Sequence, residues 1–259
     1  MSEASIHFNF SGKRLLITGG TSGMGEATAV AFVEAGANVV ISGRNQARAD
    51  AIISRLVEAR GSIDFFAGDI GQSESCEQIV SSTVDHLGGL DIVVNSAGVI
   101  YHATVEETTD AQWLHTMNVN VNGMFYICRA AIPHLRSSRG TIVNIASDAS
   151  LSGSHHLTAY CASKGAVLQM TRAMALDYAG EGIRVVPVCP GDVDTPMLRG
   201  EFRDRGVDVE TGLKASAAAV PLKRVCSAGE VAHMVLYACS DSARFITGYP
   251  LVLDGGSRA

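Results

Sequence analysis

The chain has 259 residues, 47% of them hydrophobic, and a formal net charge of −6. This length and composition allow a large core. Because no linker, low-complexity tract or repeat divides the sequence, we expect one domain over residues 1–259. The acidic balance argues against nucleic acid as a partner, since phosphate binding requires clustered lysine and arginine. A membrane is not an expected partner either, because no apolar run approaches the length that spans one.

The cysteines, the histidines and the N-terminus together indicate a cytoplasmic protein without a metal site. The six cysteines are scattered and form no C-x-x-C pair, which is typical of a reducing compartment. The eight histidines include the pair His155 and His156 but no Cys/His cluster at metal-binding spacing. Residues 1–10 contain an acidic residue and lack the apolar segment of a secretory signal.

Short apolar runs alternate with amphipathic stretches along most of the chain. The runs predict strands at residues 14–18, 38–42, 64–67, 90–95, 141–146, 184–188 and 250–253. The amphipathic stretches predict helices at residues 26–35, 46–60, 73–87, 110–135, 158–179 and 229–238. Nearly continuous apolar runs are typical of strands covered on both faces, and the alternation implies right-handed crossovers. We therefore expect an α/β fold, a doubly wound parallel sheet of about seven strands with helices on both faces.

Residues 198–220 interrupt this alternation after a strand end and show a mixed helical pattern. One interpretation is a surface excursion. We favour a lid over a substrate, because long segments at this edge of such sheets often close over bound ligands.

The strand at residues 14–18 runs directly into a glycine-rich loop, T-G-G-T-S-G-M-G. Gly19, Gly23 and Gly25 would permit a tight turn, the approach of backbone amides to a pyrophosphate, and close packing of the following helix. The N-terminus of that helix favours negative charge. An ordinary strand-to-helix turn is the alternative, but a strand before the loop and a helix after it favour a dinucleotide site.

Tyr160 and Lys164 stand four residues apart in Y-C-A-S-K, which places a phenol and an ammonium on one face of a helix. A cation beside a phenol stabilises the phenolate and lowers its pKa, so the pair predicts an acid/base function. Ser147 follows the apolar run T-I-V-N-I-A, where a buried strand would deliver its hydroxyl to the edge of the sheet.

Together these motifs resemble those of the short-chain dehydrogenase/reductase family over about residues 12–256, which implies a Rossmann-type fold. N-S-A-G at residues 95–98 is similar to the family's N-N-A-G, and V-N-V-N-G places Asn120 at its catalytic asparagine. The resemblance implies the catalytic residues Asn120, Ser147, Tyr160 and Lys164. The cofactor contacts that it implies are Gly19, Thr21, Ser22, Gly23, Met24, Gly25, Asp69, Ile70, Asn95, Ala97, Gly98, Tyr160, Lys164, Pro190, Gly191, Val193 and Thr195.

The resemblance also implies hydride transfer between a nicotinamide cofactor and a ketone or secondary alcohol, with Tyr160 as the proton donor or acceptor. Ser147 would bond the substrate oxygen, Lys164 would hold the nicotinamide ribose, and Asn120 would position a water for proton relay. The last strand and tail resemble the oligomer-forming end of the family, so we expect a homotetramer.

The residues after the second strand, V-V-I-S-G-R-N, bear on the choice of nicotinamide. An acidic residue there would bind the ribose 2′-hydroxyl and repel a 2′-phosphate, but Gly43 occupies that position. Arg44 follows and can pair with a phosphate, so we expect NADP(H), with NAD(H) as the alternative.

The substrate itself is less well specified. We expect its wall to include Tyr101, His102, Asp148, His155, His156 and Met197. Sugars, steroids, polyols, acyl thioesters and small ketones all remain open. Two other functions compete with a dehydrogenase: a nicotinamide-binding sensor without turnover, and a sugar-nucleotide epimerase or dehydratase on a related fold.

Overall fold

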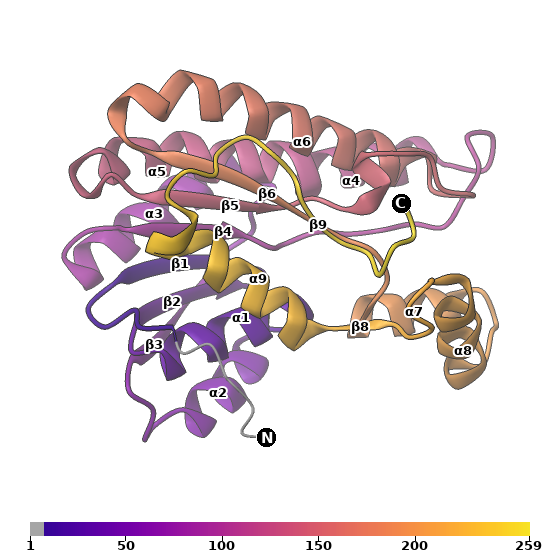
Figure 1. Cartoon of the computed structure of the whole chain (residues 1–259), viewed down its shortest axis with the longest axis horizontal. Coiled ribbons are helices and arrows are strands. Elements are labelled where there is room, and N and C mark those ends of the chain that lie inside the picture. The colour runs from indigo at the N-terminus through magenta and orange to yellow at the C-terminus, as the bar shows by residue number, and fades with distance from the viewer. Residues whose placement is uncertain (1–7) are drawn as a thin grey trace.

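In this computed structural model the described residues are 8–259, and their centre is a seven-stranded parallel sheet (Figure 1). Residues 1–7, with most of the N-terminal segment considered for a secretory signal, lie outside the described part. The strand order is β3–β2–β1–β4–β5–β6–β9, which confirms the doubly wound sheet. The strands are β1 (Arg14–Thr18), β2 (Asn38–Gly43), β3 (Ser62–Ala67), β4 (Ile92–Asn95), β5 (Thr141–Ile145), β6 (Arg184–Pro190) and β9 (Leu251–Leu253).

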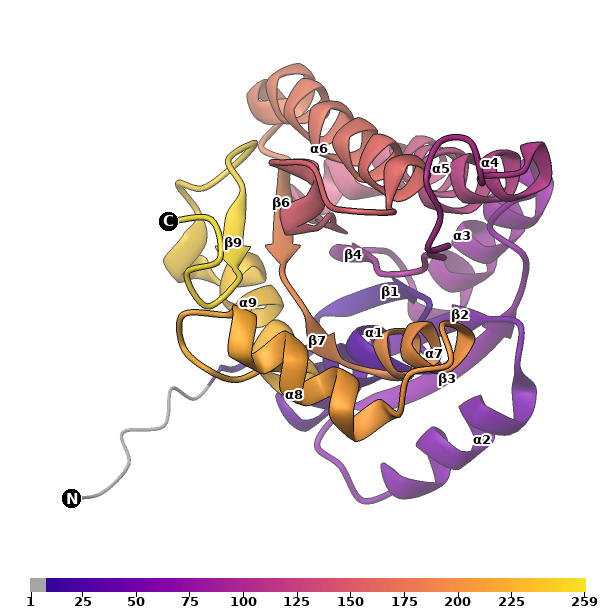
Figure 2. The same ribbon diagram turned by 90° about the vertical axis from the view of Figure 1, so that its right-hand side faces the viewer.

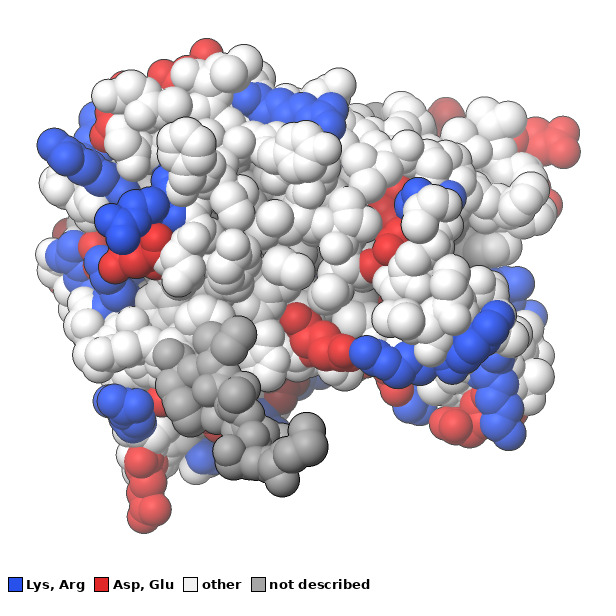
Figure 3. Space-filling view, viewed as in Figure 1, with Lys and Arg blue, Asp and Glu red and all other residues white. Residues whose placement is uncertain are grey.

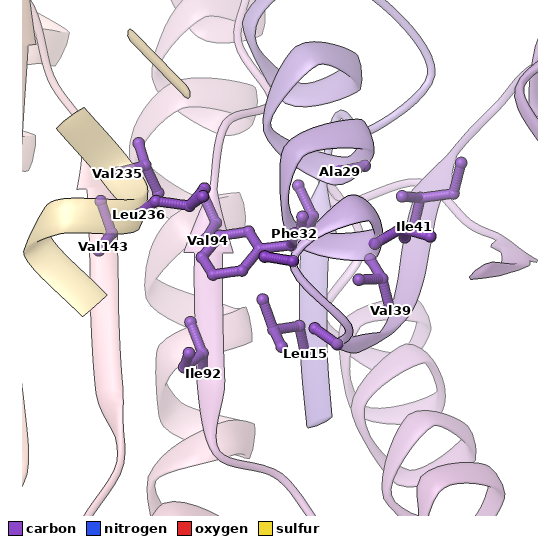
Figure 4. Packing of buried hydrophobic residues seen from close by; sticks show 14 of the residues in the cluster. Leu15, Ala29, Phe32, Val39, Ile41, Ile92, Val94, Val143, Val235 and Leu236 are labelled. Carbon is purple, nitrogen blue, oxygen red and sulfur yellow. The ribbon is translucent and has the colours of Figure 1, made fainter. Parts of the chain in front are cut away.

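Helices cover both faces of this sheet (Figure 1). One face carries α1 (Gly23–Glu34), α2 (Gln46–Arg55) and α9 (Ala228–Cys239), and the other carries α3 (Ser73–Leu87), α5 (Met124–Ser138) and α6 (Thr158–Tyr178). Successive strand residues point to opposite faces, so Leu15 and Ile17 of β1 join one hydrophobic cluster and Leu16 joins the other. Phe32 of α1 fills the first cluster against Leu15 and Val94 (Figure 4).

The predicted strands are all present, and β1 and α3 have the predicted bounds. The long predicted helix at residues 110–135 is interrupted. It comprises α4 (Asp110–Met117), a wider π-helical segment (Asn118–Gly123) and α5. Such segments insert an extra residue in a turn and occur often at functional sites. A periodicity of 3.6 residues does not reveal them, because the apolar pattern continues on both sides.

The segment predicted as a lid folds as two helices, α7 (Pro196–Asp204) and α8 (Val209–Ala219). A small second sheet of β7 (Val193–Asp194) and β8 (Cys226–Ser227) anchors its two ends. Figure 2 looks onto the carboxyl edge of the main sheet, with α7 and α8 in front of it. The structure thus places this segment at the predicted edge, and whether it moves stays a prediction.

A chain of buried amides and hydroxyls joins the middle of the sheet to α6. Asn95, the last residue of β4, donates from Nδ2 to Asn144 Oδ1 at 2.9 Å, and Asn144 Nδ2 donates to Thr171 Oγ1 at 2.9 Å. All three residues are buried, and hydrogen bonds between buried polar groups tolerate little displacement. The position of α6 against β4 and β5 is fixed in this way.

Within residues 8–259, no helix combines the length and the apolar character needed to cross a bilayer. All six cysteines lie in this part of the chain as free thiols.

Candidate active site

A cleft of about 420 Å³ opens at the carboxyl ends of β1 to β4. Its floor is the glycine loop, which turns from β1 into α1, and its far wall is the loop after β4. Most of the cofactor contacts expected from the sequence line it: Gly19, Thr21, Ser22, Gly23, Met24, Arg44, Asp69, Ile70, Ala97, Gly98 and Thr195.

The glycines of the loop are required by sterics as well as by backbone angle. Gly19 has a φ of 67°, and a Cβ there would lie 2.6 Å from the Cα of Ala97. A Cβ on Gly25 would collide with the carbonyl oxygen of Gly19, so this glycine serves the packing of helix on strand. The cleft also contains Ser42, whose buried hydroxyl has no hydrogen-bond partner. A narrow cradle with an unsatisfied hydroxyl beside a helix N-terminus fits a dinucleotide.

The end of the cleft at β2 is basic. Arg44 follows the strand, and Arg48 lies in the first turn of α2, where the Asn45 side chain accepts a hydrogen bond from the Arg48 backbone N–H at 3.0 Å. Both arginines line the cleft. Neither forms an ion pair with any other residue in the range 8–259. Arg48 was not singled out in the sequence, although a cation one turn into the following helix is the signal that could have found it.

A second cavity, of about 280 Å³, contains the catalytic candidates Ser147 and Tyr160. Met24, Thr195 and Met197 line both this cavity and the cleft, so the two spaces meet at these residues. Pro190, Gly191 and Val193, expected near the nicotinamide, line the second cavity.

Ser147 lies two residues beyond β5 and begins a short 3₁₀ turn, Asp148–Ser150. Its Oγ accepts a hydrogen bond from Ala149 N at 3.1 Å and donates one to Asp148 Oδ1 at 3.1 Å. The other carboxylate oxygen of Asp148 pairs with Arg258 at 3.3 Å. The C-terminal tail is thereby tied to the residue next to Ser147.

Lys164 is buried, and its Nζ donates to the carbonyl oxygen of Ile145 at 2.8 Å. The same Nζ lies 5.6 Å from the ring centre of Tyr160, one helical turn earlier. Burial lowers the pKa of Lys164 to about 8, which leaves the side chain mostly protonated at neutral pH.

Tyr160 differs from the expectation in one respect. Burial raises the pKa of its phenol above the ordinary value, and an interaction with Ser147 works in the opposite direction. The negative charges of Glu201 and Asp148 raise the pKa of this phenol further. Lys164 is absent from the groups that shift the pKa of this phenol, so the expected lowering does not occur among the protein's own groups, and the phenol is protonated at neutral pH.

Asn120 lies in the π-helical segment, and its side chain is held on three sides. Its Oδ1 accepts from Val99 N at 2.8 Å, and its Nδ2 donates to Val99 O at 2.9 Å and to Ser163 Oγ at 3.0 Å. A small cavity of about 10 Å³ lies between Asn120 and Lys164. That is about the space one water requires, and polar groups line it.

Several residues expected at the site line neither the cleft nor the second cavity. Gly25 packs against the loop, and Asn95 faces Asn144 and the small cavity. The Tyr101 hydroxyl lies 2.8 Å from His115 Nδ1, and His102 stacks on His156 with ring centres 4.9 Å apart. The structure does not bring Tyr101, His102, His155 or His156 to the lining of the second cavity, whereas Asp148 and Met197 do line it. No cluster among the described residues is arranged to hold a metal ion.

Comparison with known proteins gives consistent results. A family model described as Enoyl-(Acyl carrier protein) reductase matches residues 19–258. The chain is 38% identical over 252 residues to an uncharacterized oxidoreductase of Thermotoga maritima, covering 97% of this chain and 99% of that protein. It is 35% identical over 262 residues to a 3beta-hydroxysteroid dehydrogenase of Mediterraneibacter gnavus, covering 95% of each. A crystal structure from Brucella melitensis, described as short-chain dehydrogenase/reductase SDR:Glucose/ribitol dehydrogenase, has a TM-score of 0.89 and 32% identity, covering 98% of this chain and all of that one.

The fold, the cleft and these matches define a nicotinamide-dependent oxidoreductase acting on CH–OH or C=O groups. The chain belongs to the short-chain dehydrogenase/reductase family.

Proposed function

We propose that the protein is an NADP(H)-dependent ketone reductase or secondary-alcohol dehydrogenase, with Tyr160 as the proton donor and acceptor. The observation that carries the proposal is the junction of the two cavities, which brings Tyr160 and Ser147 beside the cleft that fits a dinucleotide. A screen of ketones and secondary alcohols, followed by nicotinamide absorbance at 340 nm, tests it. Absence of turnover with every substrate and both cofactors would favour a nicotinamide-binding sensor.

The chain's own residues would divide the chemistry as follows. A nicotinamide bound in the cleft supplies or accepts the hydride. Tyr160 gives its proton to the substrate oxygen in reduction, which matches a phenol that is protonated at neutral pH. Ser147 bonds the same oxygen after its hydroxyl turns from Asp148 towards the substrate, and Arg258 remains to satisfy that carboxylate. Lys164 stabilises the phenolate that forms when the proton has left.

The first prediction concerns the proton transfer. Tyr160→Phe removes the hydroxyl and keeps the ring, so we expect turnover to fall by about 10²–10⁴-fold, the usual contribution of general acid–base catalysis. The cofactor dissociation constant should change little, because Tyr160 lines the second cavity and is not part of the lining of the cleft. Steady-state kinetics and a cofactor titration by tryptophan fluorescence measure the two effects.

The matched control is Tyr178→Phe, which makes the same change at the end of the same helix and away from both cavities. We expect its turnover to remain near that of the unaltered protein. If Tyr160→Phe also retains near-normal turnover, Tyr160 is not the proton donor.

The preference for NADP(H) is supported by the basic end of the cleft. Gly43 contributes no carboxylate there, and Arg44 and Arg48 have no acidic partner within the described chain. A 2′-phosphate at this end could accept charge-assisted hydrogen bonds from both guanidinium groups, supported by the positive N-terminus of α2.

The second prediction tests this preference. A hydrogen bond to a charged group contributes roughly 1.5–3 kcal/mol. Arg44→Ala should therefore raise the Michaelis constant for NADPH by about ten- to a hundredfold and change that for NADH little, since 1.4 kcal/mol corresponds to about tenfold. The double variant with Arg48→Ala should lose more. Arg60→Ala, an exposed arginine outside the lining of the cleft, is the control.

Two results would overturn the assignment of NADP(H). One is an unaltered protein that already prefers NADH. The other is an unchanged ratio of kcat/KM for NADPH to kcat/KM for NADH in the Arg44 and Arg48 variants. Gly43→Asp is a less informative variant, because a Cβ at Gly43 would lie 3.0 Å from Thr21 Oγ1 and would disturb the loop itself.

We also propose a cytoplasmic homotetramer, in which α7 and α8 act as a lid. The free thiols of all six cysteines support a reducing compartment. The C-terminal part of the chain exposes Phe245, Tyr249 and Val252, with Phe245 fully accessible. β9 is an edge strand, and the surface over β9 and α9 in Figure 3 carries few charged side chains. An uncharged surface beside an unpaired strand edge is suited to contact with a symmetry-related copy.

The third prediction concerns this assembly. Phe245→Asp combined with Tyr249→Asp should convert a tetramer into smaller species, because the charges would be buried in the interface. Size-exclusion chromatography with light scattering measures the mass. Val57→Asp changes a comparably exposed apolar residue beyond α2 and should leave the tetramer intact. If the double variant has the same mass as the unaltered protein, the interface lies elsewhere. If the unaltered protein has the mass of a single chain, it does not assemble.

A further inference from the structure

The cavity that contains Tyr160 is unusually rich in ionisable side chains for its volume of about 280 Å³. Asp148, Asp192, Glu201 and Arg258 all line it. Any substrate class assigned from this lining rests on the proposed function and deepens it, because the cavity is part of the same site.

The four charged groups fall into two sets with different bonding. Asp148 and Arg258 pair with each other, and Arg258 also lies 3.4 Å from Ser154 Oγ. Glu201, in the middle of α7, and Asp192, after β6, form no side-chain hydrogen bond or ion pair with residues 8–259. The Asp192 side chain is exposed, Glu201 is half-buried, and both line the cavity. A bound molecule can therefore satisfy them.

The surroundings of Glu201 disfavour the charged form of its carboxyl group. It is half-buried, and withdrawal from water and then the charge of Asp192 raise its pKa to about 7. The charged groups around it are Asp192, Asp204 and Arg205, and it lines the same cavity as Tyr160. Because the folded-state pKa exceeds the ordinary value of 4.5, the carboxyl lowers the stability of the fold progressively as pH rises from about 4.5 to about 7, and the full loss is present above that range.

The lining discriminates between classes of substrate. An apolar substrate would strip water from Glu201 and Asp192 without replacing its hydrogen bonds. An anionic substrate would be repelled by the same carboxylates. A cationic one could pair with them but would leave the donors of the lining, the Arg258 guanidinium and the serine hydroxyls, without an acceptor. A neutral hydroxyl can donate to a carboxylate and accept from a guanidinium or serine hydroxyl.

We infer that the substrate is a polyhydroxylated alcohol or its ketone, a polyol or sugar, and that Glu201 selects it by accepting a hydrogen bond from a hydroxyl away from the reacting carbon. Asp192 and Arg258 bond further hydroxyls of the same molecule. α7 thus contributes a specificity-determining residue as well as a wall.

The test compares ring alcohols that differ only in their substituents: cyclohexanol, trans-cyclohexane-1,2-diol, inositol and trans-2-aminocyclohexanol. We expect kcat/KM for the better substrate of the diol and inositol to exceed that for cyclohexanol at least tenfold. When cyclohexanol binds, the charged groups of the site have no additional hydroxyl with which to form hydrogen bonds. Glu201→Leu should lower the ratio of kcat/KM for that polyol to kcat/KM for cyclohexanol at least tenfold. Glu210→Leu, on α8 of the same segment and outside the lining, should leave the ratio unchanged.

Glu201→Gln separates selection from a structural role. At pH 8 we expect its Tm to exceed that of the unaltered protein, while the two should agree at pH 4, where the carboxyl is neutral in both states. The polyol-to-cyclohexanol ratio should still fall, because an amide is a weaker acceptor than a carboxylate.

Several results would overturn the inference and leave the proposed function standing. These are turnover of cyclohexanol or of apolar ketones with no gain from added hydroxyls, a preference for the amino alcohol, or a ratio that neither Glu201 variant alters. Absence of turnover with every alcohol and ketone would instead contradict the proposed function.

Discussion

The site depends on one hydrogen bond, from the buried ammonium of Lys164 to the carbonyl oxygen of Ile145 at the end of β5. This bond ties α6 to the carboxyl edge of the sheet at the point where the strand ends. Ser147 lies two residues beyond that carbonyl, and Tyr160 lies one helical turn before the lysine, so the bond fixes both hydroxyls relative to the cleft. The buried chain from Asn95 through Asn144 to Thr171 supports the same helix about two turns further along.

Burial of these groups has an energetic consequence. Desolvation disfavours the charged forms of Lys164, Tyr160 and Glu201. It therefore lowers the pKa of the lysine and raises the pKa values of the tyrosine and the glutamate. A site whose charges are poorly solvated destabilises the fold somewhat, but it binds a complementary polar molecule more strongly because water competes less.

The sequence predicts what is local in the chain. The apolar runs locate every strand of the main sheet, and the ends of those strands locate the glycine loop and Ser147, because residues that follow parallel strands share one edge. The rest depends on contacts between distant segments. Arg258 reaches Asp148 from the C-terminal tail, Glu201 of α7 lines the same cavity as Tyr160, and the π-helical turn at Asn120 leaves no mark on the apolar periodicity. His102 and His156 stack on each other and do not line the cavity that contains Tyr160, so their contact with the substrate stays a prediction.

The central claim is that Lys164 is withdrawn from water and held against the sheet as a cation beside Tyr160. NMR titration of side-chain-labelled lysines tests it directly, because the other lysines, Lys13, Lys214 and Lys223, are all exposed. The account predicts one lysine signal that titrates near pH 8 and disappears in Lys164→Met. A Lys164 signal that titrates near the ordinary value of about 10.4 would show a solvated side chain and would contradict the account.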